Sequence, residues 1–267
     1  MTEARSRGLS SFIGAVRTVL HLSPHPDDEV LGAGATLLAL RDTGHHVINL
    51  AVTLGSDERE RPRRLHEVER ACQRAGFELV VHDPGRDLAA AVRALIAERG
   101  AGLVVAPSPH DAHPRHEAVG RAARDAVEAE RGTDPPPRLW LWGLWGDLPR
   151  PTLYHGFDEV LMRQAIHVLE AHAGELARND YRDLLRARAT ANRVLGAERV
   201  FGWGAPRRDQ PFAELLMEVV VGQDDWWTTT PRALDVKRPL EDPPEPTAAI
   251  GWWLHAPSFT DRGAARH

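Results

Sequence analysis

The stretch Thr18-Val19-Leu20-His21-Leu22-Ser23-Pro24-His25-Pro26-Asp27-Asp28-Glu29 decides the fold. Its beginning, Thr18–Leu22, is mostly apolar and predicts a buried strand. An imidazole and two carboxylates follow within the four residues from His25 to Asp28. Open α/β sheets bind their ligands outside the carboxyl ends of the strands. The residues that follow this strand in the sequence are therefore the first candidate site.

Strand and helix patterns alternate through the first half of the chain. We predict strands at 18–22, 47–53, 78–81, 103–106 and 138–142, and helices at 29–41, 62–75, 88–99 and 116–131. Strands separated by helices of this length indicate βαβ units. The predicted fold class is α/β, with a Rossmann-like, mostly parallel sheet flanked by helices.

The pattern changes after Pro149. Apolar residues at helical spacing predict helices at 158–173 and 180–195, and residues 212–221 are interpreted as a further helix. From Gln223 onward tryptophan, proline and charged residues dominate, and Pro243-Pro244-Glu245-Pro246 reads as a linker or loop. We expect one domain over 1–267, with a core of about 18–150 and a helical and irregular C-terminal extension of about 151–267.

Composition excludes several classes of protein. The 267 residues carry a formal net charge of −5, so nucleic acid and anionic membranes are not expected partners. Cys72 is the single cysteine, which excludes an internal disulfide and a thiolate metal site within one chain. The N-terminal apolar run is too short for a signal peptide or membrane helix, so the predicted location is cytoplasmic and no membrane insertion is expected.

A second polar cluster, His110-Asp111-Ala112-His113-Pro114-Arg115-His116, follows the strand predicted at 103–106. A catalytic zinc site needs three protein ligands and one open position for water. His25 and Asp28 can reach one ion from their shared turn, and His116 is the natural third ligand. Zinc is the expected metal, although Fe(II), Co(II) or Mn(II) also suit two histidines and an aspartate.

Two residues remain beside this predicted metal site. Asp27 can take a proton from a water whose pKa the metal has lowered. His113 can hydrogen-bond a carbonyl oxygen, stabilise an oxyanion or protonate a leaving amine. Together these groups predict a hydrolase of amides or esters.

Both motifs, in this order, make residues Thr18 to about Gly120 similar to the PIG-L/LmbE-type zinc N-deacetylases. The resemblance implies that His25, Asp28 and His116 bind zinc and that Asp27 is the general base. It also implies that His113 stabilises the transition state. The implied reaction removes an N-acetyl group from an N-acetylglucosamine-type aminosugar in a small glycoconjugate, and the C-terminal extension is expected to contribute to the substrate pocket.

Further residues are assigned by the resemblance alone. Val52-Thr53-Leu54-Gly55 is similar to the family's turn after the second strand. The helix that follows carries Arg64, and the resemblance implies that this arginine contacts substrate hydroxyls. Asp57 falls where relatives place an acidic substrate contact. The chain departs from the family at Arg115, where aspartate is common, and at Asp111, where some relatives have tyrosine. Asp111 is assigned either to the substrate or to orienting His113 or a metal-binding histidine.

Other functions remain open at this point. The alternative within the same chemistry is an amidase that cleaves a larger acyl group from a thiol conjugate or an antibiotic-like substrate. A metal phosphoesterase needs a second ion, and a non-catalytic sugar-binding protein would not need Asp27. The tryptophans suit a sugar ring, simple packing or a homo-oligomer interface.

Several residues have structural interpretations. Gly32-Ala33-Gly34 lacks the third glycine of a dinucleotide fingerprint, so no nucleotide cofactor is expected. His110 is interpreted as a loop residue rather than a fourth ligand, His21 as a core residue, and His45 and His46 as solvated. Glu29 is either an acidic residue in the first turn of a helix or a group that steadies a ligand.

Overall fold

The computed structural model describes residues 17–240, 245–258 and 260. Its main sheet has the strand order β10-β8-β7-β5-β4-β1-β2-β3, and β6 pairs with β7 and β9. The strands are β1 Thr18–Ser23, β2 His46–Ala51, β3 Glu78–Val81, β4 Ala101–Pro107, β5 Arg138–Trp142, β6 Leu153–Phe157, β7 Phe212–Val221, β8 Trp226–Thr229, β9 Arg232–Ala233 and β10 Pro246–Ala249. Strands β1 to β5 are parallel, which confirms the predicted fold class.

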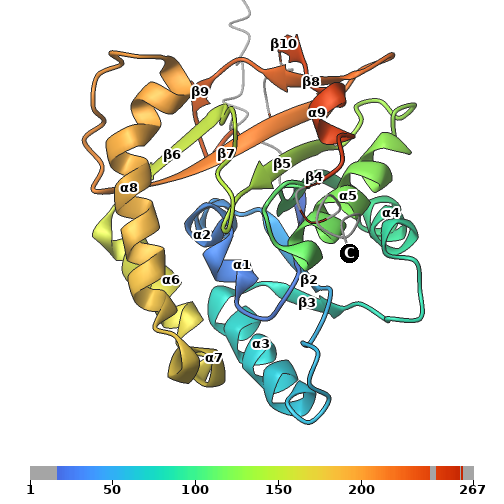
Figure 1. Ribbon diagram of the computed structural model, residues 1–267, viewed down its shortest axis with the longest axis vertical. Helices are drawn as coiled ribbons and strands as arrows, with labels where there is room; N and C mark the ends of the chain where they lie inside the picture. The colour runs from blue at the N-terminus through green and yellow to red at the C-terminus, as the bar shows by residue number, and fades with distance from the viewer. Residues whose placement is uncertain (1–16, 241–244, 259, 261–267) are drawn as a thin grey trace, which may run out of the picture.

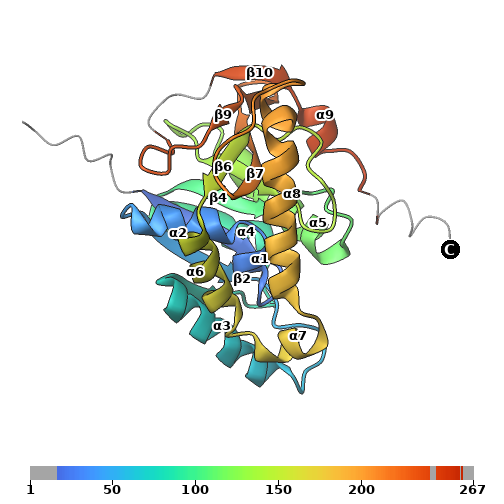
Figure 2. The same cartoon turned by 90° about the vertical axis from the view of Figure 1, so that its left-hand side faces the viewer.

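Helices cover both faces of this sheet (Figures 1 and 2). They are α1 Asp28–Leu31, α2 Gly34–Asp42, α3 Arg61–Ala75, α4 Leu88–Arg99, α5 Pro114–Glu128, α6 Glu159–Leu169, α7 Ala173–Arg178, α8 Tyr181–Phe201 and α9 Gly251–Leu254. Among the described residues, no helix combines the length and the apolar character needed to cross a bilayer.

Successive residues of the parallel strands pack into two different cores. Val19 of β1 lies in the core formed with α1, α2, α3, α6 and α8. Leu20 lies in the opposite core, formed with α4, α5 and α9. Side chains alternate across a strand, so a strand buried on both faces must be apolar at nearly every position. This is why the strand predictions of the first half hold.

The helix predicted at 29–41 is divided into α1 and α2 at Gly32 and Ala33. A Cβ added to Gly32 would lie 2.6 Å from the ring of Trp142, so the chain passes this indole without a side chain. The first turn of α2 gains a partner from far along the chain. The Glu214 carboxylate accepts the backbone N–H groups of Ala35 and Thr36, at 2.9 and 2.8 Å. A carboxylate there satisfies amides that the helix itself cannot pair.

The helix interpretation of residues 212–221 is wrong, because they form the long strand β7. β7 pairs antiparallel with β5, β6 and β8, and nine of its ten residues are buried. A short, almost wholly apolar run has no periodicity that separates a buried strand from a buried helix. The β-branched Val219-Val220-Val221 is the sequence feature that favours a strand.

Other boundaries in the C-terminal half also differ from the predictions. The helix predicted at 158–173 ends at Leu169 and is followed by α7, and the next helix extends to Phe201. The segment after Gln223 is more regular than expected, since it contains β8, β9, β10 and α9. Of the predicted loop at 243–246, Pro243 and Pro244 lie outside the described residues, and Pro246 begins β10.

The solvated interpretation holds for His46 but is wrong for His45. His45 is only 6% exposed, and its Nδ1 accepts the backbone N–H of Arg17 at 3.2 Å. The hydrogen bond pins the chain just before β1 to the start of β2.

Gly120 of α5 packs against the loop that follows β4, and this contact can be tested. A Cβ there would lie 2.5 Å from the carbonyl oxygen of Pro107 and 2.7 Å from the nitrogen of Pro109. We expect Gly120→Ala to lower the free energy of unfolding by about 1–3 kcal/mol because backbone must move, although alanine ordinarily stabilises a helix. Gly132→Ala is the matched control, since its Cβ would meet nothing within 4 Å. Denaturant unfolding that finds Gly120→Ala as stable as the control would contradict this packing.

Candidate metal centre and cleft

The two polar motifs lie side by side because β1 and β4 are neighbouring parallel strands. From β1 the chain crosses to β2 on one side, and from β3 it returns to β4 on the other side of β1. This is the point where the strand order reverses, and open α/β sheets bind their ligands at such a point. The loops after β1 and β4 therefore meet at one edge of the sheet.

His25, Asp28 and His116 converge at this edge. Each offers one ligand atom, and these atoms lie within 4.8 Å of one another. Asp28 Oδ2 lies 3.2 Å from His25 Nδ1 and 3.3 Å from His116 Nε2. Among the described residues no other group of three His, Cys, Asp or Glu side chains has this arrangement. Two imidazoles and a carboxylate suit a divalent transition metal such as zinc.

The fully buried Asp111 lies behind His116 rather than in the cleft. His116 Nδ1 donates to Asp111 Oδ2 at 2.8 Å. Asp111 Oδ1 accepts the backbone N–H groups of Leu144, Trp145 and Gly146, at 2.7, 3.1 and 3.0 Å. A carboxylate can only accept these bonds, so the proton of a neutral His116 sits on Nδ1 and leaves Nε2 free for a metal. The predicted contact between Asp111 and substrate does not fit this burial, whereas the orienting alternative does.

The electrostatics of the metal-free site favour a cation. Burial disfavours the charged Asp28 carboxylate, but the charges and hydrogen bonds of His116 and His25 hold its pKa well below the usual range. Burial likewise lowers the pKa of His116, yet the Asp28 charge and the hydrogen bonds to both aspartates raise it to about 9. A metal ion must displace the proton from His116 to bind there. The donor chemistry and the oriented imidazole thus both fit a bound cation.

Asp27 lines the same cleft but is not part of the metal-binding set. Its φ of 112° is left-handed, a conformation that aspartate tolerates better than most residues. The backbone N–H of Asp27 donates to Glu29 Oε2 at 3.0 Å. Burial, followed by the charges of Asp28 and Glu29, raises the pKa of Asp27 well above its usual value. Asp27 and Asp28 therefore have different surroundings, which shift their pKa values in opposite directions.

His113 lies beside the two histidines of the candidate metal site. Its ring centroid is 5.1 Å from that of His25 and 4.7 Å from that of His116, and it stacks on Trp145 at 5.9 Å. Burial, then the charges of His116 and His25, lower its pKa. Its Nδ1 is buried without a hydrogen-bond partner among the described residues. Arg115 occupies the position where the resembling family commonly has aspartate, so this motif supplies no carboxylate there.

These residues open into a cleft of about 1180 Å³. Its wall includes four arginines, an exposed tryptophan and a tyrosine: Arg61, Arg64, Arg115, Arg178, Trp145 and Tyr181. Arg64 Nη2 donates to the carbonyl oxygen of Pro26 at 3.3 Å, and its Nη1 lies 3.4 Å from Glu175. Helix α7 and the start of α8 thus form part of the cleft. Their contribution could not be read from the sequence, since ordinary surface helices carry the same residue types.

The remaining predicted site residues lie elsewhere. Asp57 does not line the cleft, and its carboxylate pairs with Arg59 Nη2 at 2.9 Å. His110 is a loop residue with Nε2 at 2.6 Å from the carbonyl oxygen of Trp253. His21 is a fully buried core residue, and its Nδ1 lies 2.8 Å from Asn49 Oδ1.

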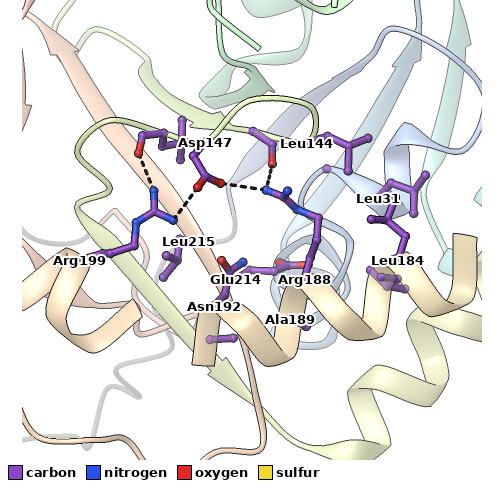
Figure 3. A pocket seen from close by; sticks show the side chains of 15 residues that line it. Leu31, Leu144, Asp147, Leu184, Arg188, Ala189, Asn192, Arg199, Glu214 and Leu215 are labelled. Carbon is purple, nitrogen blue, oxygen red and sulfur yellow. Dashed lines mark hydrogen bonds and ion pairs between the residues drawn. The ribbon is translucent and has the colours of Figure 1, made fainter. Parts of the chain in front are cut away.

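A second, smaller pocket lies behind the cleft, and Leu31 and Leu144 line both (Figure 3). In Figure 3, Arg188 and Arg199 of α8 point at Asp147, each at 3.6 Å. Arg188 also donates to the carbonyl oxygen of Gly143 at 3.0 Å. Helix α8 therefore holds the 143–148 loop on the side of the second pocket. This loop carries Trp145, and its backbone amides donate to Asp111.

The family model described as "PIG-L: GlcNAc-PI de-N-acetylase" matches residues 20–127, which contain both motifs. Over these residues, which make up less than half of the chain, the sequence is similar to the PIG-L family. The probable N-acetyl-alpha-D-glucosaminyl L-malate deacetylase 2 of Bacillus cereus is 32% identical over 134 residues, 42% of this chain and 61% of that protein. Diacetylchitobiose deacetylase of Thermococcus kodakarensis is 30% identical over 132 residues, 42% of this chain and 49% of the relative. The similarity thus spans only about half to three-fifths of each relative.

Solved structures share the fold at lower identity. The N,N'-diacetylchitobiose deacetylase of Pyrococcus horikoshii has a TM-score of 0.59 at 19% identity, covering 76% of this chain and 83% of its own. The 4-carboxy-2-hydroxymuconate hydratase GalB of Pseudomonas putida has a TM-score of 0.60 at 17% identity, covering 77% and 97%. GalB is named as a hydratase rather than a deacetylase, so this fold alone does not determine the reaction.

The orientation of His116 by Asp111 can be tested with Asp111→Asn. The asparagine oxygen can still accept the three backbone amides, but its NH₂ group then faces His116 Nδ1 and requires a lone pair there. We expect the proton to move to Nε2 and the affinity for zinc to fall about 10- to 100-fold, measured by competition with a chromophoric chelator. The matched control is Asp57→Asn, which lies outside the cleft. Equal affinity for zinc in the two variants would show that Asp111 does not orient a ligand.

Proposed function

We propose that this chain is a metal-dependent hydrolase that removes an N-acetyl group from an N-acetylglucosamine-type aminosugar in a small glycoconjugate. The observation that carries this proposal is the pair of adjacent aspartates with different surroundings. Asp28 shares one oxygen with two imidazoles, whereas Asp27 lines the cleft beside them. A site built only to hold a metal would not need the second carboxylate. The names of the two curated relatives support this substrate class.

In the proposed reaction, His25, Asp28 and His116 hold zinc. The bound ion would supply Lewis acidity, which lowers the pKa of water and polarises a carbonyl group. Asp27 takes a proton as water adds to the acetyl carbon. His113 hydrogen-bonds the carbonyl oxygen as negative charge develops on it. The C–N bond then breaks, the nitrogen takes up the proton, and the products are acetate and a free amine.

The cleft supports a glycoconjugate rather than a free monosaccharide. Its volume of about 1180 Å³ lies above the usual range of small-molecule sites, which is about 300–1,000 Å³. Trp145 is 55% exposed beside His113, where its ring can cover the apolar face of a sugar. Arg115 is exposed on its wall, which favours an anionic group on the aglycone. Arg61 and Arg178 also line the wall but are paired with Glu58 and Glu175.

We also propose that the C-terminal extension belongs to the same domain as the core and completes the substrate pocket. β7 lies between β5 and β8 in the sheet, and α7 lines the cleft. The alternative amidase keeps the same chemistry and differs in the acid released. A phosphoesterase is disfavoured because the described residues contain one three-residue ligand set rather than two.

The first test is acetate release from a panel of N-acetylglucosamine conjugates by the zinc-loaded chain. We expect conjugates with a carboxylate or phosphate on the aglycone to have about 2- to 5-fold higher kcat/KM than neutral conjugates of the same size, as exposed ion pairs allow. Release of a longer acid without acetate, from matched N-acyl substrates, would favour the amidase. No hydrolysis of any member would contradict the proposed function.

Asp27→Asn separates the base from the ligands. Asparagine keeps the size of the side chain and tolerates the left-handed backbone, but it cannot take up the proton. We expect acetate release to fall at least about 100-fold, which is the lower range of general base catalysis. Elemental analysis should find the same zinc stoichiometry as in wild type. His116→Ala should instead lose the zinc. If Asp27→Asn loses the metal and His116→Ala keeps it, the assigned roles are wrong.

A further inference from the structure

A buried hydrogen bond joins the motif after β1 to the corner between α6 and α7. Glu29 Oε1 lies 2.5 Å from His172 Nε2, and both side chains are fully buried. His172 has no place in the metal set and does not line the cleft. The contact therefore serves neither metal binding nor substrate binding directly.

The other oxygen of Glu29 holds the backbone of Asp27. Glu29 Oε2 accepts the Asp27 N–H at 3.0 Å, at the one residue of this motif whose φ is positive. A strained conformation persists only where its surroundings determine it. One carboxylate thus links His172 to the peptide that aims the Asp27 side chain into the cleft.

His172 itself is held firmly. Its carbonyl oxygen accepts the N–H of Leu176, and its own N–H donates to Leu169, both at 3.0 Å. Two residues on, the N–H of Gly174 donates to Glu67 of α3 at 2.9 Å. The imidazole is therefore attached to a corner that is fixed to a neighbouring helix, and it can transmit that position to Glu29.

The unpaired ring nitrogen of His172 determines which of the two nitrogens carries the proton in the contact with Glu29. Nδ1 is buried without a hydrogen-bond partner among the described residues, so a proton there would be unsatisfied. The arrangement without that cost has the proton on Nε2, donated to Glu29. A glutamine side chain can place an N–H near the position of Nε2, whereas leucine fills the space without a donor.

We propose that His172 is a positioning residue that sets the orientation of Asp27 through Glu29. The proposal rests on the proposed function only in that Asp27 is the base; the structural link is independent of it. Because His172 contacts neither the metal ligands nor the cleft, its loss should lower kcat and leave KM and zinc affinity nearly unchanged. Loss of an outer hydrogen bond to a functional group ordinarily costs about 10- to 100-fold.

The experiment compares His172→Leu, His172→Gln and the control His155→Leu in the full chain. His155 is also a buried histidine, but its Nδ1 pairs with Thr36 Oγ1 at 2.9 Å, outside the motif. We expect His172→Leu to lower kcat at least 10-fold with KM and zinc affinity within 2-fold of wild type. His172→Gln should recover most of that loss, and His155→Leu should change Tm but not kcat.

A second measurement uses the metal-free protein and no substrate. Amide hydrogen exchange at Asp27 should be at least 10-fold faster in His172→Leu than in wild type and near wild type in His172→Gln. Wild-type exchange at Asp27 in His172→Leu would overturn the proposal, as would equal losses of kcat in the leucine and glutamine variants. If exchange responds as expected while wild type shows no hydrolysis, the positioning link stands and the proposed function fails.

Discussion

The parallel pairing of β1 with both β2 and β4 is the constraint on which the site depends. It places the ends of β1 and β4 next to each other, at the position where the chain reverses its direction of travel across the sheet. Two motifs that are far apart in sequence then share one edge. The metal-binding set needs no other long-range contact, because His25 and Asp28 come from one turn and His116 from the first turn of α5.

The same edge concentrates buried carboxyl groups. Asp27, Asp28, Glu29 and Asp111 are all buried. Buried carboxylates are tolerated only when they are paired or hydrogen-bonded. Asp28 is paired with two histidines, Glu29 with His172 and Asp111 with His116 and three amides. Each of these histidines thus contacts at least one carboxylate, and Asp28 is shared by His25 and His116.

The sequence was sufficient for those parts of the molecule in which local pattern and neighbouring strands agree. Glu78–Val81, Leu88–Arg99 and Arg138–Trp142 have the predicted bounds, because each is closed by turn residues or helix caps that act locally. Phe212–Val221 was misinterpreted because its environment is set by β5 and β8, which a local pattern does not reveal. The convergence of His25, Asp28 and His116 was predictable. The contacts of Glu175 with Arg64 and of His172 with Glu29 were not, since each joins residues more than 100 positions apart.

The C-terminal half therefore does more than cover the core. Helix α8 binds the 143–148 loop from behind through Arg188 and Arg199, while Asp111 binds three amides of that loop from the other side. His172 contacts Glu29 of the motif after β1. The residues expected to perform chemistry come from the first half of the chain, and part of their support comes from the second. Such a fold can change the cleft through α7 and α8 without altering the sheet, which is consistent with a shared fold in proteins of different named activities.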